Sequence, residues 1–122
     1  MALGIHKTGK FGEDFAVKIL KKKGYKILER NFHSRFGEID VIASNKNVIA
    51  FVEVKTRGEN SLYLPREAVD RFKMQKCIKT AQYYLVQNPS NLQPRFDVFE
   101  VVLNTDGKKQ NVLDYKYIEN AF

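Results

Sequence analysis

Three charged residues, Asp40, Glu53 and Lys55, stand in two apolar segments at positions where an ordinary strand would carry valine or threonine. Burying an unpaired charge is costly, so charged residues in such segments usually bind something. A pair of carboxylates suits Mg²⁺ or Mn²⁺, and a lysine beside them can orient a water molecule or stabilise developing negative charge. These residue types are therefore suited to a site that binds a divalent cation. The competing interpretation is a structural salt-bridge cluster at a strand end.

The spacing of the two segments predicts how these side chains meet. If the chain reverses in a two-residue turn that begins at Lys46, opposed positions have numbers that sum to 93. Asp40 then faces Glu53. By the same register, Glu38 faces Lys55. Directly opposed residues have Cβ atoms roughly 4.5–5.5 Å apart, where two carboxylates repel unless a cation lies between them. A four-residue turn gives the same pairing, whereas a three-residue turn shifts it by one unless a bulge restores it.

Length and composition predict one domain over residues 1–122 in a reducing compartment. The chain has 122 residues and is 43% hydrophobic, which suffices for a core without disulfides. Its single cysteine, Cys77, falls among apolar residues in a helical pattern and is expected to be buried. The sequence has neither an apolar run of about 18 residues nor a signal-peptide pattern, so we expect a cytoplasmic protein with no membrane partner.

The net charge of +7 favours a polyanionic partner, and nucleic acid is the foremost candidate. The alternative is ordinary surface charge that keeps the protein in solution. The longest basic run, at positions 21–23, also suits the negative end of a helix dipole, so it does not by itself indicate a phosphate contact.

The pattern of apolar residues and turn residues predicts the order helix, three strands, helix, two strands. A tight hairpin requires antiparallel strands, and a long helix between the third and fourth strands allows a parallel crossover. We therefore expect an α/β fold with a mixed sheet and helices on its faces. Gly24 should end the first helix. The predicted ranges are a helix at 8–23, strands at 25–32, 38–44 and 48–56, a helix at 66–87 with a bend or N-cap at Asp70, and strands at 95–103 and 110–115.

This order, with Asp40, Glu53 and Lys55 in these places, resembles the restriction-endonuclease-like fold and its PD-(D/E)xK active site. More closely, the chain resembles the uncharacterised bacterial YraN-type family, which is regarded as a nuclease family similar to archaeal Holliday junction resolvases. The matching stretches extend over nearly the full length: Gly12-Glu13, Gly24-Tyr25-Lys26-Ile27-Leu28, Arg30-Asn31, Gly37-Glu38-Ile39-Asp40, Phe51-Val52-Glu53-Val54-Lys55-Thr56-Arg57, Glu67-Ala68-Val69 and Arg95-Phe96-Asp97-Val98.

The resemblance implies a role for each matching residue. Asp40 and Glu53 would hold Mg²⁺ or Mn²⁺, Lys55 would act on the attacking water, and Glu13 would approach from the first helix. From its spacing alone, Glu13 is an exposed acid that suits a helix N-terminus. Ile39 stands where the wider superfamily often has proline, a departure of little weight. The resemblance to resolvases also implies branched or structured DNA as substrate and a homodimer that reaches two strands.

Four other residues are weaker candidates. Glu38 could hold Lys55 by an ion pair or act as an outer acid near the metal. Arg57, Lys73 and Lys76 are candidate contacts to nucleic acid, and a solvated charge is the alternative for each. Asp97 recurs in the matching stretches, but the sequence suggests no physical role for it.

We therefore predict a metal-dependent endonuclease that hydrolyses phosphodiester bonds of DNA. The alternative is a nucleic-acid-binding module that keeps the fold without turnover, and a third interpretation is a small interaction protein with an incidental basic surface. The residues leave open DNA or RNA, duplex, single-stranded or junction substrate, and any sequence preference.

Overall fold

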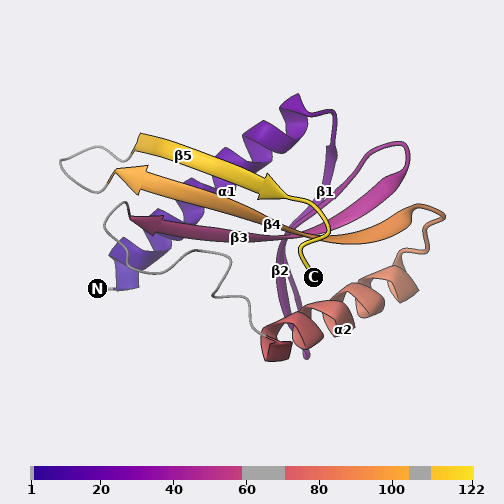
Figure 1. The fold of residues 1–122 in the computed structure, drawn as a ribbon. Coiled ribbons are helices and arrows are strands. Elements are labelled where there is room, and N and C mark those ends of the chain that lie inside the picture. The colour runs from indigo at the N-terminus through magenta and orange to yellow at the C-terminus, as the bar shows by residue number, and fades with distance from the viewer. Residues whose placement is uncertain (1, 59–70, 105–110) are drawn as a thin grey trace.

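The computed structural model describes residues 2–58, 71–104 and 111–122, with side chains from residue 9 onward. Two helices and five strands follow one another in the predicted order, as Figure 1 shows. Their bounds are α1 Ala2–Lys22, β1 Lys26–Ser34, β2 Gly37–Ser44, β3 Val48–Gly58, α2 Arg71–Gln87, β4 Gln93–Asn104 and β5 Asn111–Ile118.

The strands form one mixed sheet in the order β1-β2-β3-β4-β5. Strands β1–β2, β2–β3 and β4–β5 pair antiparallel, whereas β3 and β4 pair parallel because α2 carries the chain back between them. The predicted mixed sheet with helices is thus confirmed. Strand β3 lies in the centre and is buried from Ile49 to Glu53, which explains its nearly continuous apolar sequence.

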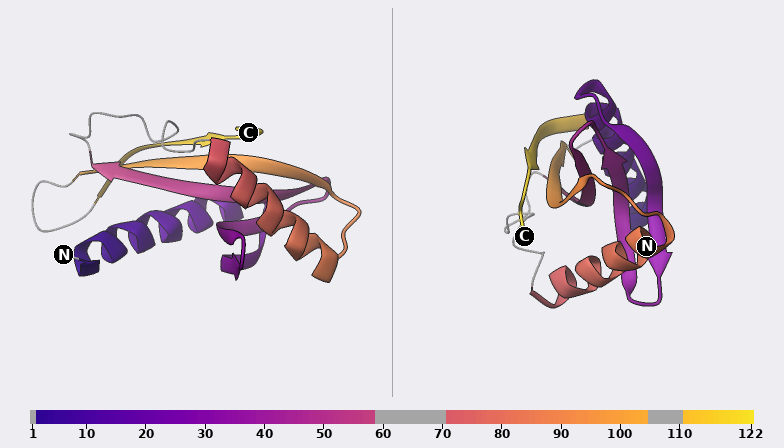
Figure 2. Two further views of the ribbon diagram at one scale, coloured as in Figure 1. Left: turned by 90° about the horizontal axis from the view of Figure 1, so that it is seen from below. Right: turned by 90° about the vertical axis from the view of Figure 1, so that its right-hand side faces the viewer.

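The two helices cover opposite faces of the sheet (Figure 2). Helix α1 packs Ala16, Val17 and Leu20 against one face, together with β3 residues Ala50 and Val52. Helix α2 packs against the other face, where its buried residues meet Ile42 and Phe51. Alternate residues of β3 therefore point to different helices, and Glu53 and Lys55 belong to the same alternation as Phe51.

Helix α1 ends as predicted at a glycine. Gly24 has a φ of +95°, which favours glycine, and the amide of Tyr25 bonds to the carbonyl of Leu20 at 3.0 Å. The helix begins at Ala2, earlier than the predicted position 8. Glycine lowers helix propensity, but the glycines near this end do not prevent the helix from forming.

Helix α2 is observed from Arg71, and the predicted residues 66–70, including the bend or cap at Asp70, lie outside the described residues. Cys77 is buried, as predicted, beside Ala81 and Tyr84. Within the described ranges, neither helix is long and apolar enough to cross a membrane.

The hairpin between β2 and β3 has the predicted register. Four observed pairs, from Val41 with Val52 to Ser44 with Ile49, all sum to 93. The side-chain Oδ1 of Asn45 accepts hydrogen bonds from the amides of Asn47, at 2.9 Å, and Val48, at 2.8 Å. These bonds stabilise the tight turn and thereby fix the register.

Candidate active site

The candidate site lies where β2 and β3 separate. Their pairing stops at Val41 and Val52, although β3 continues to Gly58 alongside β4 and β2 reaches back to Gly37 alongside β1. Figure 1 shows β2 running at a steep angle to β3 beyond this point. Asp40 is the first residue past the last pair, and its Oδ2 accepts a hydrogen bond from the amide of Val54 at 2.8 Å. This hydrogen bond takes the place of a backbone hydrogen bond between the two strands. It fixes Asp40 at the point where β2 and β3 separate, which we call the fork.

Asp40 and Glu53 bring two carboxylates into a buried place. Asp40 is 9% exposed and Glu53 is 8% exposed. Burial, and next the negative charge of Glu53, raise the pKa of Asp40 to about 7. The predicted meeting of these two acids is therefore observed, and near neutral pH the buried carboxyl of Asp40 is only partly ionised.

Two lysines reach the same carboxylate. The Nζ atoms of Lys55 and Lys73 each lie 3.8 Å from Oε1 of Glu53. Burial, and then the proximity of Lys73, lower the pKa of Lys55. From the sequence, Lys73 is a candidate nucleic-acid contact or a solvated charge, whereas in the structure α2 directs it at Glu53. Sequence periodicity assigns a residue to a side of the helix, but it does not say which strand residue that side meets.

Glu13 approaches Asp40 from α1. Its side chain is 18% exposed, and burial, followed by the charge of Asp40, raises its pKa. A side-chain hydrogen bond from Asn31 and the charge of Arg30 oppose this rise. Asn31 has a φ of +53° in the middle of β1, an unusual conformation for a residue other than glycine. The structure thus brings Glu13 near Asp40 and gives a role to Asn31, which lies in a matching stretch but has no role assigned from the sequence.

Gly12 allows α1 to approach the sheet closely. A Cβ atom built at Gly12 would lie 2.1 Å from Oγ1 of Thr56, so no side chain fits there. Thr56 follows Lys55 in β3, and Glu13 follows Gly12 in α1. The close approach therefore holds Glu13 beside the site. A glycine inside an apolar helical pattern is a signal that could have indicated such packing.

A cavity of about 400 Å³ opens beside Glu53 on the α2 side of the sheet. Its walls come from Gly37 and Glu38 of β2, Glu53 of β3, and Phe72, Lys73, Lys76 and Cys77 of α2. Gly37 has a φ of +152° and lies against Lys76, since a Cβ there would be 3.4 Å from the Cβ of Lys76. The start of β2 and α2 together form the rim, and Glu53 of the acidic pair faces a space that a ligand can enter.

Glu38 does not face Lys55, contrary to the predicted register. The β2–β3 pairing ends before it, so Glu38 instead pairs with His33 of β1. Its Oε2 lies 3.2 Å from Nδ1 of His33. Glu38 still lines the cavity, and its charge contributes to the raised pKa of Glu13. Arg57 lies farther along β3, where its Nη1 donates to the carbonyl of Gly58 at 3.2 Å.

The donor set at the fork fits a divalent cation that keeps several water molecules. Among the described residues, no three His, Cys, Asp or Glu side chains form a ready-made metal cluster. Mg²⁺, however, is commonly held by one or two carboxylates, with water as its remaining ligands. Asp40 and Glu53 supply hard oxygen atoms. Burial, and after it the charge of Glu53, disfavour the ionised form of Asp40, and a bound cation would favour that form.

A second buried acid, Asp97 of β4, has a different environment. It is fully buried, and its carboxylate accepts hydrogen bonds from Arg95 Nε at 2.9 Å, from the Tyr117 hydroxyl, and from the Asn120 amide at 3.0 Å. Arg95 also donates to the hydroxyl of Tyr25 at 2.5 Å. We call these five residues the Asp97 network. It ties the start of β1 and the end of the chain to β4, which gives Asp97 the structural role that the sequence did not suggest.

The comparisons with known proteins agree with the expected membership of an uncharacterised family. Residues 12–101 match the family described as uncharacterised protein family UPF0102. A UPF0102 protein of Caldanaerobacter subterraneus subsp. tengcongensis is 51% identical over 116 residues, which cover 94% of this chain and 93% of the relative. One from Persephonella marina is 46% identical over 110 residues, 89% of this chain and 95% of the relative. One from Clostridium acetobutylicum is 48% identical over 117 residues, which cover 95% of this chain and 93% of the relative.

Proposed function

We propose that this chain, which belongs to the uncharacterised protein family UPF0102, is a metal-dependent endonuclease that hydrolyses phosphodiester bonds of DNA. The observation that carries the proposal is the meeting of Asp40, Glu53 and Lys55 in a buried fork beside an open cavity. Two buried carboxylates that lie close together, with lysines beside them, are suited to bind a cation and a phosphate together.

Asp40 and Glu53 would hold the metal, Mg²⁺ or Mn²⁺. A cation bound there would polarise the scissile phosphate and stabilise the charge that develops on it. The hydrogen bond from the Val54 amide to Oδ2 keeps Asp40 in place for this task. Glu13 would orient water at the same site by accepting a hydrogen bond, with Asn31 fixing its position.

Lys55 and Lys73 would have different roles: Lys55 would act on the attacking water, and Lys73 on the phosphate. The ammonium of Lys55 is largely buried, at 15% side-chain exposure, and is suited to orient the attacking water by donating a hydrogen bond. Lys73 is 43% exposed at the edge of the cavity, where it would pair with a phosphate oxygen. Lys76 and Arg57, together with the net charge of +7, would add contacts to the sugar-phosphate backbone.

The proposal is tested by incubating the purified protein with labelled single-stranded, duplex and four-way-junction DNA, and matching RNA, in Mg²⁺, Mn²⁺ or EDTA. We expect cleavage that needs the metal and falls about 100-fold or more in Glu53→Gln. Glu29→Gln is the matched control, because Glu29 is an exposed acid of β1 outside the site. Size-exclusion chromatography with light scattering tests the homodimer that would place two sites on two strands.

The outcomes separate the candidate functions. Binding without cleavage in any metal would favour a nucleic-acid-binding module that keeps the site without turnover. An equal loss of cleavage in Glu53→Gln and Glu29→Gln would contradict the assigned site. Failure to bind any of these nucleic acids at low salt would overturn the proposal and favour an interaction protein with a basic surface.

A further inference from the structure

Phe72, at the start of α2, is a large aromatic residue that the fold leaves 66% exposed. A single exposed apolar residue needs no explanation by itself. Val86, for example, is 79% exposed on the same helix and lies outside the cavity. Phe72 differs because it lines the cavity that also contains Glu53. An exposed ring and a candidate catalytic carboxylate therefore share one space.

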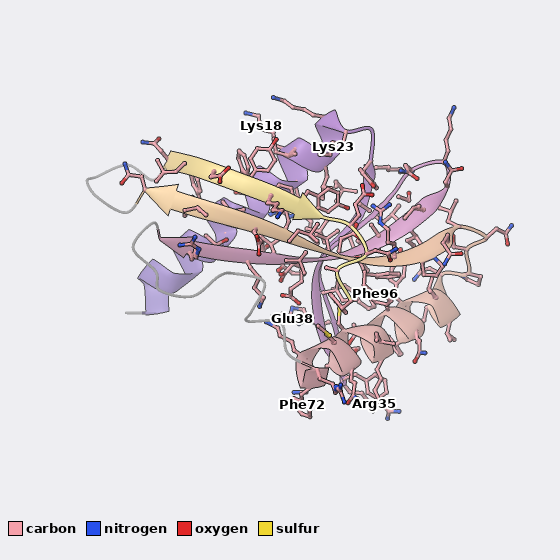
Figure 3. The ribbon with its side chains drawn as sticks, viewed as in Figure 1. Lys18, Lys23, Arg35, Glu38, Phe72 and Phe96 are labelled. Carbon is pink, nitrogen blue, oxygen red and sulfur yellow. The ribbon has the colours of Figure 1, made fainter. Side chains whose placement is uncertain are left out.

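The surroundings of Phe72 carry positive charge. The Nζ of Lys76 lies 4.5 Å from the centre of the Phe72 ring. Across the rim, the guanidinium of Arg35 lies 5.0 Å from the centre of the Phe36 ring. The turn that carries Arg35 and Phe36 leads into Gly37, which packs on Lys76. Figure 3 shows Arg35 and Phe72 at the same end of the molecule, far from Lys18 of α1 and from Lys23, which follows that helix.

Rings beside cations at a cavity mouth suit a nucleotide better than an apolar protein segment. A nucleobase can stack on an aromatic ring, while ammonium and guanidinium groups pair with the phosphates on either side of it. The bases of an intact duplex are already stacked on each other, so their faces cannot reach a side chain. A ring in this position therefore favours a strand whose base is unpaired.

We propose that Phe72 is a stacking platform for an unpaired base next to the phosphate that Lys73 and the metal at Glu53 would hold, so that the substrate is single-stranded DNA or DNA with unpaired bases at the cleaved position. The position of that phosphate rests on the proposed nuclease function. Stacking of the base does not require turnover, so binding tests the inference separately. Lys73 and Lys76 would hold the backbone while the base occupies the cavity beside the ring.

The test measures binding of short oligonucleotides that carry 2-aminopurine, with Ca²⁺ or EDTA in place of Mg²⁺. The probes are a single strand, the matching duplex, and a duplex with a short unpaired bubble. Stacking on Phe72 should quench 2-aminopurine at one or two positions of the single strand and the bubble. Phe72→Ala should remove this quenching and weaken their binding about 5- to 150-fold, because stacking contributes ~1–3 kcal/mol per base.

Three variants separate stacking from apolar contact and from folding. Phe72→Trp should keep the quenching and the affinity, whereas Phe72→Leu, which keeps apolar area without a ring, should lose both. Val86→Ala should behave as the unchanged protein. Thermal unfolding of each variant should stay within a few degrees of the unchanged protein, because both positions are exposed.

The results distinguish this inference from the nuclease proposal. If quenching depends on Phe72 but no metal supports cleavage, the stacking site stands and the nuclease does not. If DNA is cleaved but Phe72→Ala weakens single strand and duplex equally, or Phe72→Leu binds as well as Phe72→Trp, the stacking site is overturned. Absence of binding to every probe would overturn it as well, and a protein partner would become the better occupant of this surface.

Discussion

Asp97 and Asp40 are both buried aspartates of the same sheet, but their partners differ. Asp97 is enclosed by an arginine, a tyrosine hydroxyl and a backbone amide, all of which donate hydrogen bonds to it. Asp40 accepts a hydrogen bond from one backbone amide and faces the carboxylate of Glu53. Burial, followed by the charge of Glu53, raises the pKa of Asp40 to about 7. One charge is matched by donors, whereas the other is opposed by a like charge beside an open cavity.

This difference separates a structural acid from a functional one. A buried carboxylate that already accepts hydrogen bonds from protein donors holds elements together. Its oxygen atoms are then occupied and do not need a ligand. A carboxylate whose charge is opposed in the folded state gains most when a cation arrives. Both residues occur in apolar strands, so composition alone does not tell them apart. The three predictions below test the distinction, from the largest expected effect to the smallest.

Replacing Asp97 should affect stability more than any change at Asp40. In Asp97→Ala, Arg95 is left largely buried without its main partner, and we expect a loss of about 3–5 kcal/mol in the free energy of unfolding. Urea denaturation measures this loss. Asp114→Ala is the control, because Asp114 is exposed on β5, and it should change stability by less than about 0.5 kcal/mol. A stable Asp97→Ala protein that had lost cleavage would reverse the two assignments.

Replacing Asp40 should stabilise the metal-free protein at alkaline pH. Because the pKa of Asp40 is raised by folding, the folded state binds a proton that the unfolded chain releases between about pH 4 and pH 7. Stability from this residue is therefore lost as the pH rises through that window. Asp40→Asn has no such loss, so it should be more stable than the unchanged protein by about 1–3 kcal/mol at pH 8 and equal to it near pH 4.

Urea denaturation in EDTA at the two pH values measures this difference, and the difference between proteins removes the contribution of all other titrating groups. Added Mg²⁺ should stabilise the unchanged protein at pH 8 but not Asp40→Asn. A variant that is less stable than the unchanged protein at pH 8 would mean that Asp40 is a structural acid like Asp97.

Two glycines of α1 offer a matched test of how the helix holds Glu13. Gly12→Ala places a methyl group against Thr56, so we expect a loss of about 1–2 kcal/mol and several-fold slower cleavage as Glu13 shifts. Gly9→Ala meets nothing within 4 Å and should instead stabilise the helix by about 0.5–1 kcal/mol. Thermal unfolding and cleavage rates of both variants provide the comparison.

Adding Thr56→Ala to Gly12→Ala should restore part of the loss, because it removes the hydroxyl and methyl that the new side chain meets. If Gly12→Ala and Gly9→Ala behave alike, the close approach of α1 does not position Glu13. The fork would then differ from the Asp97 network only in the residues that the strands supply.

Much of the fold and part of the site could be predicted from the sequence because they depend on local or alternating patterns. The hairpin register followed from a short polar turn, and it correctly brought Asp40 near Glu53. The end of α1 at Gly24 followed from glycine's freedom to adopt a positive φ. The same register failed for Glu38, because it assumed that β2 and β3 stay paired, whereas the strands separate after Val41 and Val52.

The order of the elements, the register of the central hairpin and the two carboxylates with their lysine can be read from the amino-acid sequence, because turns, caps and alternation act over a few residues. Three contacts are seen only in the folded protein: Lys73 lies beside Glu53, Gly12 lets α1 pack closely on Thr56, and Asp97 accepts hydrogen bonds from Arg95 and Tyr117. These contacts join residues that are far apart in the sequence, and they depend on how the sheet twists and how the helices pack on it. Sequence periodicity gives the face of each element, but not what that face meets.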